Sequence, residues 1–227
     1  MTGEFDSRFV SVTGTSLNVS RIGLGTWAIG GWMWGGSDEE ESIKTIHAAV
    51  EGGINLIDTA PAYGFGRSEE IVGRAIADRN LRSRVVIATK TGLEWKDGKV
   101  FRNASRDRIL LEIGASLRRL KTDYIDIYQV HWPDPLVAIE ETAEAMQTLL
   151  DRGQIRAIGV SKFLGCPNRA VSPRRQAARR AAALQSVRAR DREGALVLLP
   201  AIGLGNLDLR CTVPRSVVRQ AAGRRGV

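Results

Sequence analysis

Five apolar segments, each followed by a short connection or a helical pattern, constrain the fold of this chain most strongly. The segments lie at residues 22–26, 54–57, 84–90, 124–131 and 155–161. Apolar residues recur at helical spacing between them, and these helices are expected at residues 38–51, 68–77, 105–120 and 136–152. Alternating strands and helices with short connections favour right-handed βαβ units and a parallel sheet. The pattern predicts an α/β fold, a (β/α)8 TIM barrel that is incomplete, with about five recognisable βα units.

Local signals refine this picture at the start of the chain. Residues 9–12 and 17–20 flank a turn at Gly14, which predicts an N-terminal β-hairpin before the barrel strands. Ser37 and Ser68 stand where N-caps of the first two helices are expected. His47 lies in the first helix and is expected to be a surface or half-buried side chain.

The composition changes abruptly after Phe163. Residues 164–227 contain 13 Arg, no Lys and three acidic residues, whereas residues 1–163 contain 20 basic and 22 acidic residues. All 13 aromatic residues stand at or before Phe163. Two units are therefore predicted: a partial barrel at residues 1–163, and an Arg/Ala-rich tail at 164–227 in which only residues 195–199 have the pattern of a strand.

Two explanations of the tail remain open. Its abundance of Arg, Ala, Gly and Pro is what a GC-rich coding sequence yields when it is translated out of frame. Alternatively, the tail is a basic, disordered extension that is weakly attracted to anionic surfaces. Scattered arginines without aromatic residues argue against a specific nucleic-acid partner.

Several classes of protein are disfavoured by the rest of the sequence. No apolar run of about 18 residues predicts a membrane span. The N-terminus lacks the apolar core of a secretory signal, and Cys166 and Cys211 are far apart without metal-ligand spacing. A cytoplasmic protein with reduced thiols and no metal site is expected.

Chemically useful side chains stand at the predicted carboxyl ends of three successive strands. Asp58 ends the second strand, Tyr63 follows it, Lys90 ends the third, and His131 ends the fourth. In a barrel these ends meet at one mouth. An ammonium beside a phenol stabilises the phenolate, so such a group can donate a proton to a carbonyl oxygen that becomes an alkoxide. Each residue alone also has a structural explanation, such as a buried Asp–Lys ion pair.

These segments resemble those of the aldo-keto reductases. The stretch Gly53-Ile-Asn-Leu-Ile-Asp-Thr-Ala-Pro-Ala-Tyr-Gly-Phe-Gly-Arg-Ser-Glu69 is similar to that family's signature, and Ile87-Ala-Thr-Lys90 and Ile127-Tyr-Gln-Val-His131 resemble the segments with its lysine and histidine. The tryptophan-rich loop after the first strand is most similar to the bacterial general-stress and potassium-channel β-subunit branch. The resemblance covers about residues 8–163. It implies that Tyr63 is the general acid, that Lys90 and Asp58 tune it, and that His131 orients the carbonyl.

The resemblance also implies binding residues. The cofactor would be NADPH, in contact with the following residues: Gly25, Thr26, Trp27, Asp58, Ser161 and Lys162. Lys162 departs from the family, which usually has asparagine there. Trp32, Trp34 and Trp132 are predicted to wall the substrate pocket, although a loop packed on its own barrel rim explains Trp32 and Trp34 equally well.

The predicted function is the reduction of an aldehyde or ketone to an alcohol by hydride transfer from NADPH. The partner would be a small carbonyl compound. The alternative is an inactive barrel remnant without a complete cofactor site, which is non-enzymatic or associates with itself. The family features that follow the fifth strand, including a phosphate-gripping loop, are not recognisable after Phe163. The sequence does not specify the substrate, the preference between NADPH and NADH, or the oligomeric state.

Overall fold

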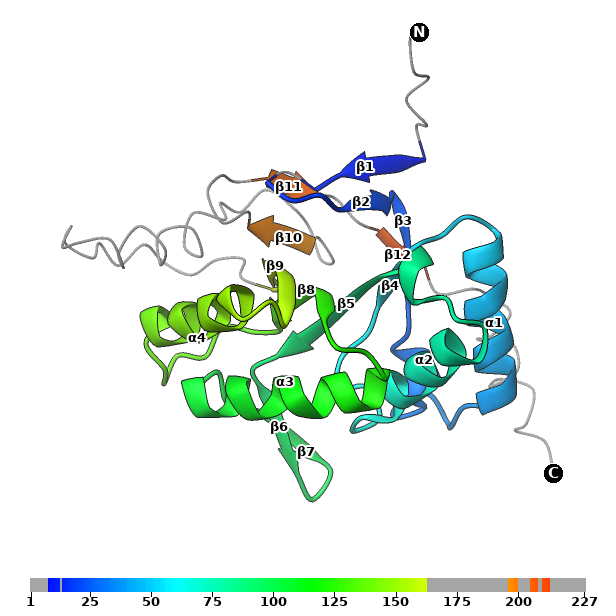
Figure 1. Ribbon diagram of the computed structural model, residues 1–227. Helices are drawn as coiled ribbons and strands as arrows, with labels where there is room; N and C mark the ends of the chain where they lie inside the picture. Colours follow the sequence, from blue (N-terminus) through cyan, green and yellow to red (C-terminus); the bar gives the residue numbers. More distant parts are fainter. Residues whose placement is uncertain (1–7, 13, 163–195, 200–204, 208–209, 213–227) are drawn as a thin grey trace, which may run out of the picture.

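A computed structural model describes residues 8–12, 14–162, 196–199, 205–207 and 210–212 of the chain. Its centre is a parallel sheet with helices on one side (Figure 1). The five parallel strands predicted from the sequence are present, with bounds shifted by two residues or fewer at each end. They are β3 (Ile22–Gly25), β4 (Leu56–Asp58), β5 (Val86–Thr91), β8 (Ile125–Val130) and β9 (Ile155–Val160). The prediction of an α/β parallel fold is confirmed.

Four α-helices follow or connect these strands and cover the same face of the sheet (Figure 1). They are α1 (Glu39–Glu51), α2 (Arg67–Asp78), α3 (Arg106–Leu120) and α4 (Ile139–Asp151), with short 3₁₀ turns η1 (Ala28–Gly30) and η2 (Arg82–Arg84). Both cap predictions were wrong. The carboxylate of Asp38, rather than Ser37, caps α1 by accepting from Glu41 N. Gly66 occupies the cap position of α2 because its φ of 101° favours glycine, so Ser68 lies inside the helix.

Three further strands extend this sheet. β10 (Leu196–Leu199) pairs antiparallel with β9, β11 (Gly205–Leu207) pairs with β10, and β12 (Arg210–Thr212) runs parallel to β3 at the other edge. The strand expected at residues 195–199 is therefore present as β10. Most of the predicted tail lies outside the described residues. Within the described part, the sheet runs from β11 to β12 without closing.

Apolar side chains of the strands pack on both faces of the sheet, as expected for parallel strands that are covered on both sides. On the helix face, Ile57, Ile87 and Tyr128 join the large core beneath α1–α4. On the opposite, inner face, Leu56 and Ile127 pack with Val19 of the N-terminal hairpin. Because successive side chains alternate between faces, this packing decides which residues point to the inner face.

Two β-hairpins flank the barrel strands. The N-terminal hairpin, β1 (Phe9–Ser11) and β2 (Asn18–Ser20), is present as predicted. A second hairpin, β6 (Leu93–Lys96) and β7 (Lys99–Arg102), was not predicted. Its turn residues Asp97 and Gly98 have φ values of 50° and 73°, which is typical of the type I′ turns that Asp-Gly favours. The Asp-Gly pair was the signal for this hairpin.

The expectation for His47 was wrong. The side chain is buried, and one ring nitrogen lies 2.7 Å from the carbonyl oxygen of Ala75. His47 therefore joins α1 to α2 instead of facing solvent. Among the residues described, no helix is long and apolar enough to cross a membrane.

Candidate active site

The ion pair between Lys90 and Asp58 forms the base of the candidate site. Both side chains point to the inner face, at the carboxyl ends of β5 and β4. Lys90 Nζ lies 2.7 Å and 2.9 Å from the two carboxylate oxygens of Asp58, and it also donates to Thr59 O at 2.9 Å. Lys90 is buried, so the ammonium has its partners within the protein. The pair predicted from the sequence is therefore formed.

The charge state of Lys90 follows from two opposing effects. Burial by itself lowers the pKa of a lysine, because desolvation penalises the charged form. The Asp58 carboxylate and the Tyr63 phenol outweigh this effect, so the pKa of Lys90 is raised above its ordinary value. Lys90 is thus an ammonium throughout the physiological pH range.

Tyr63 lies beside this ammonium. Lys90 Nζ is 5.0 Å from the centroid of the Tyr63 ring, and the ring of His131 is 5.9 Å from that of Tyr63, edge-on. The loop between β4 and α2 that holds Tyr63 is tightly bonded: Tyr63 N donates to Ala60 O, and Ser68 N donates to Tyr63 O. All four predicted catalytic residues therefore meet at one place.

A close backbone approach fastens the same loop to η1. A Cβ atom built on Gly30 would lie 2.6 Å from the carbonyl oxygen of Tyr63, and one on Gly64 would overlap the Gly30 carbonyl. Gly64 also has a φ of 66°, where glycine is favoured. No residue with a side chain fits at either position without moving the Tyr63 backbone.

His131 follows β8 and is buried at the same mouth. Its backbone N–H donates to Thr91 O at 2.8 Å, which extends the pairing of β8 with β5. Burial is the main cause that holds the pKa of His131 well below its ordinary value, and the charges of Lys90 and Lys162 act in the same direction. The imidazole is therefore neutral at pH 7 and has one N–H donor and one acceptor nitrogen.

Gln129 was not among the residues predicted for the site. This buried side chain donates from Nε2 to Asp58 Oδ1 at 3.4 Å, so Asp58 is contacted from β5 and from β8. Gln129 stands two residues before His131 and hence on the same face of the strand. That spacing was the available signal.

Aromatic rings surround Tyr63. Trp27 lies 6.3 Å from Tyr63 and 5.5 Å from Trp34, both measured between ring centroids. In a separate ring contact, Trp32 packs against Phe65, with the ring centroids 5.0 Å apart. The ring of Trp132 lies 5.9 Å from that of His131.

The hairpin β6–β7 adds an aromatic residue that the sequence analysis did not include. Trp95 on β6 lies 5.8 Å from Phe65, measured between ring centroids. Trp32, Phe65 and Trp95 thus form a continuous series of ring contacts from the loop after η1 to the hairpin.

Comparison with known proteins identifies this arrangement. The sequence pattern of the Aldo/keto reductase family matches residues 21–166, which is more than half of the 227 residues. The chain belongs to the aldo/keto reductase family. The matched range contains every residue of the candidate site.

Individual relatives agree with this assignment. The chain is 64% identical over 155 residues to the aldo-keto reductase YhdN of Bacillus subtilis strain 168, covering 68% of this chain and 47% of YhdN. It is 45% identical over 162 residues to an NADH-specific methylglyoxal reductase of Escherichia coli K12, covering 65% of this chain and 49% of that protein. The chain spans about half the length of the curated relatives it matches.

A solved structure gives the same result for the fold. The glycerol dehydrogenase of Gluconobacter oxydans superposes with a TM-score of 0.64 at 50% identity, over 70% of this chain and 50% of that one. The incomplete barrel predicted from the alternating pattern is therefore confirmed as an aldo/keto reductase fold.

The residues predicted to bind the family's cofactor do not all face the mouth. Thr26 is completely buried, and its hydroxyl contacts Asp58 O at 3.0 Å and Ser68 Oγ at 2.7 Å. The Thr26 side chain thus holds strand ends together. Gly25 ends β3 directly beside Asp58 in the sheet register.

The other predicted cofactor residues lie at the edge of the mouth. Trp27 is 42% exposed, so one part of its ring is accessible beside Tyr63. Ser161 N donates to Val130 O at 2.9 Å, which places Ser161 at the end of β9. Lys162 is exposed, has a φ of 58°, and its Nζ lies 5.2 Å from the centroid of the Trp132 ring.

Proposed function

We propose that this chain carries the proton-donating side of a carbonyl reductase site that converts an aldehyde or ketone to an alcohol. The convergence of Tyr63, Lys90, Asp58 and His131 at one end of the sheet carries the proposal. A phenol beside a buried ammonium suits this reaction, because the positive charge stabilises the phenolate that remains after the proton is given up.

Each of the four side chains has a distinct part in the proposed reaction. Tyr63 donates the proton to the carbonyl oxygen. Lys90 supports the phenolate, and the bidentate contact with Asp58 keeps the ammonium in place. The neutral imidazole of His131 donates a hydrogen bond that orients the carbonyl oxygen toward Tyr63.

The residues at the mouth fit a nicotinamide cofactor. The accessible ring of Trp27 beside Tyr63 offers a flat apolar surface, and Gly25, Asp58, Ser161 and Lys162 lie at the adjoining strand ends. When bound, such a cofactor supplies the hydride that reduces the carbonyl carbon. The resemblance predicts NADPH, whereas the named Escherichia coli relative is NADH-specific, so both cofactors belong in any test.

The aromatic series around Tyr63 favours a small substrate with apolar surface. Trp34 is connected to Tyr63 through Trp27, and Trp132 contacts His131, so both offer apolar surface near the pair, in agreement with the general character of small-molecule sites. We propose Trp32 as a wall residue as well, through its contact with Phe65.

A cytoplasmic location and the division of the chain near residue 163 remain predictions.

Cofactor titration of the full chain tests the proposal. Because Trp27, Trp32 and Trp34 lie near the proposed site, saturable quenching of tryptophan fluorescence by NADPH or NADH is expected, followed by cofactor oxidation when methylglyoxal is added. Quenching by neither cofactor together with no turnover would support the alternative, an inactive remnant, and would reject the proposed function.

A further inference from the structure

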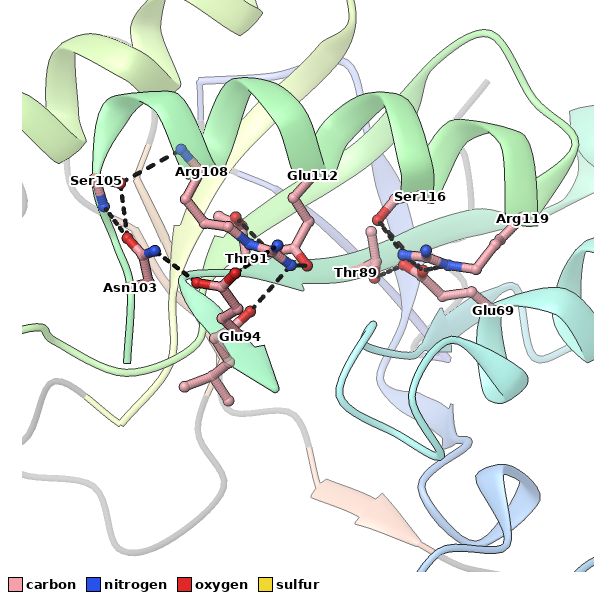
Figure 2. A network of polar contacts seen from close by, with 11 residues as sticks. Glu69, Thr89, Thr91, Glu94, Asn103, Ser105, Arg108, Glu112, Ser116 and Arg119 are labelled. Carbon is pink, nitrogen blue, oxygen red and sulfur yellow. Dashed lines mark hydrogen bonds and ion pairs between the residues drawn. The ribbon is translucent and has the colours of Figure 1, made fainter. Parts of the chain in front are cut away.

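Two buried glutamates lie behind β5, on the face opposite to Lys90. Figure 2 shows them in two groups of polar side chains between α3 and the strand. Thr89 and Thr91 flank Lys90 and point to the helix face, where Thr89 Oγ1 donates to Glu69 at 2.6 Å and Thr91 Oγ1 donates to Glu112 at 3.0 Å. The strand segment that presents Lys90 is thus bonded on both sides of the lysine.

The two glutamates have closely similar surroundings. Each is paired with an arginine of α3: Arg119 Nε donates to Glu69 at 2.7 Å, and Arg108 Nη2 donates to Glu112 at 2.5 Å. Burial is the main cause that raises the pKa of both carboxyl groups, although the arginines act in the opposite direction. In both pairs, the arginine therefore offsets part of the desolvation cost of burying the carboxylate.

The glutamates differ in what they connect. Glu112 belongs to α3, and its carboxylate accepts from Thr91 on β5 and from Arg108 of the same helix, so its bonds join α3 to β5. Glu69 belongs to the first turn of α2, which directly follows the Tyr63 loop. Its carboxylate accepts from Thr89 on β5 and from Ser116 and Arg119 on α3. Glu69 thus ties the helix after the Tyr63 loop to the strand that carries Lys90.

Two neighbouring contacts make this connection stiff. Ser68 Oγ lies 2.7 Å from Thr26 Oγ1 and 3.0 Å from Thr59 Oγ1, in a buried group of hydroxyls at the ends of β3 and β4. The aliphatic part of Arg119 covers Gly66, where an added Cβ would lie 2.9 Å from Arg119 Cδ. The end of the Tyr63 loop is therefore held from two sides.

We propose that Glu69 is a positioning residue that sets the distance between Tyr63 and Lys90. The role rests on the proposed function, in which that distance governs proton donation. Small displacements in catalytic groups have large effects on rate. Loss of the Glu69 contacts would let α2, and with it the Tyr63 loop, shift against β5.

Glu69→Gln and Glu112→Gln form a matched pair of variants for the test. Both remove a buried charge that is bonded to a threonine of β5 and an arginine of α3, but only the first acts on α2. The measurement is the ionisation of the Tyr63 phenol in the full chain, followed by NMR of ¹³Cζ-labelled tyrosine and assigned with Tyr63→Phe. It needs neither cofactor nor substrate.

In Glu69→Gln, Tyr63 is expected to ionise at a pH higher by ~0.5 units or more, because the phenol shifts away from the stabilising ammonium of Lys90. In Glu112→Gln the midpoint is expected to stay within ~0.2 units of the parent. Equal shifts in both variants, or no shift in Glu69→Gln, would overturn the proposal. If the parent chain shows no turnover but the shift is specific to Glu69→Gln, the positioning role stands and only the proposed function fails.

A second pair keeps the test decisive if Glu69→Gln does not fold. Thr89→Val and Thr91→Val are isosteric changes that remove one donor to Glu69 and one to Glu112. The Tyr63 midpoint is expected to rise in Thr89→Val alone, and an unchanged midpoint there would count against the proposal. In a chain that turns over, Thr89→Val should also lower kcat with little change in KM.

Discussion

The ammonium of Lys90 lies between the carboxylate of Asp58, with Nζ–Oδ1 at 2.7 Å, and the ring of Tyr63, whose centroid is 5.0 Å from Nζ. One cation thus contacts a fixed anion and stands next to a group that becomes an anion when it donates its proton. Because Lys90 is buried, its ammonium relies on these groups of the protein for its stabilisation. The stability of the fold and the chemistry of the site therefore depend on the same charge.

Removal of the fixed anion tests this dependence. Asp58→Asn leaves a buried ammonium without its counter-ion and is expected to lower the free energy of unfolding by about 3 kcal/mol. Urea denaturation of the parent, Asp58→Asn, Lys90→Met and the double variant measures the effect. The double variant should lose clearly less than the sum of the single losses, since the two residues form one unit. Additive losses would mean that the pair is not coupled.

Tyr63→Phe removes the phenol oxygen and keeps the ring that contacts Trp27 and His131. In a chain that turns over, kcat is expected to fall by roughly 10²–10⁴-fold, the contribution of a positioned proton donor. Thermal stability should change little. Tyr124→Phe is the matched control, because Tyr124 stands just before β8, at the end of the strand opposite to His131, and between Arg82 and Arg156. An equal loss in the control, or none in Tyr63→Phe, would reject Tyr63 as the acid.

Gly30→Ala tests the close approach that holds the Tyr63 loop. The added methyl would lie 2.6 Å from the Tyr63 carbonyl oxygen, so the backbone has to move, and a loss of about 1–3 kcal/mol in unfolding free energy is expected. Gly114→Ala in α3 is the control, since its Cβ would meet only the Arg118 side chain, at 3.6 Å. This variant is expected to gain about 0.5–1 kcal/mol in unfolding free energy. Equal stability of Gly30→Ala and the parent would show that the loop is not clamped at this point.

The lowered pKa of His131 predicts a pH dependence of stability. Below the ordinary histidine pKa of about 6.5, the unfolded chain binds a proton at this residue that the folded chain does not, so unfolding becomes easier as the pH falls. Below pH 6.5, the loss of unfolding free energy from this residue approaches about 1.4 kcal/mol for each further pH unit. Unfolding free energies of the parent and His131→Gln at pH 7.5, 6.5 and 5.5 measure it.

The difference in unfolding free energy between the parent and His131→Gln reports on His131 alone. Glu69 and Glu112 have raised pKa values and act in the opposite direction, but both proteins contain them. As the pH falls, the unfolding free energy of the parent should therefore decrease relative to that of His131→Gln. Parallel curves would show that the imidazole is protonated equally in the folded and unfolded chain.

Much of the fold was accessible from local patterns. A strand buried on both faces, such as β5, begins as a continuous apolar run, and the helices between the strands follow their apolar spacing. The errors have local causes. Ser68 has the residue type of a cap, but Gly66 takes the cap position because the chain enters α2 with a positive φ. His47 was placed outside because a single histidine carries no sign of a partner 28 residues away.

The sequence by itself determined which residues stand at the ends of the strands, since strand order and side-chain alternation are local properties. Asp58, Tyr63, Lys90 and His131 were found in this way, together with the family they indicate. Only the tertiary structure decided their charge states and supports. The contacts of Lys90 with Asp58, of Gln129 with Asp58, and of Glu69 with Arg119 join residues 32, 71 and 50 positions apart. Burial and pairing across such separations depend on how the elements pack, which no local pattern specifies.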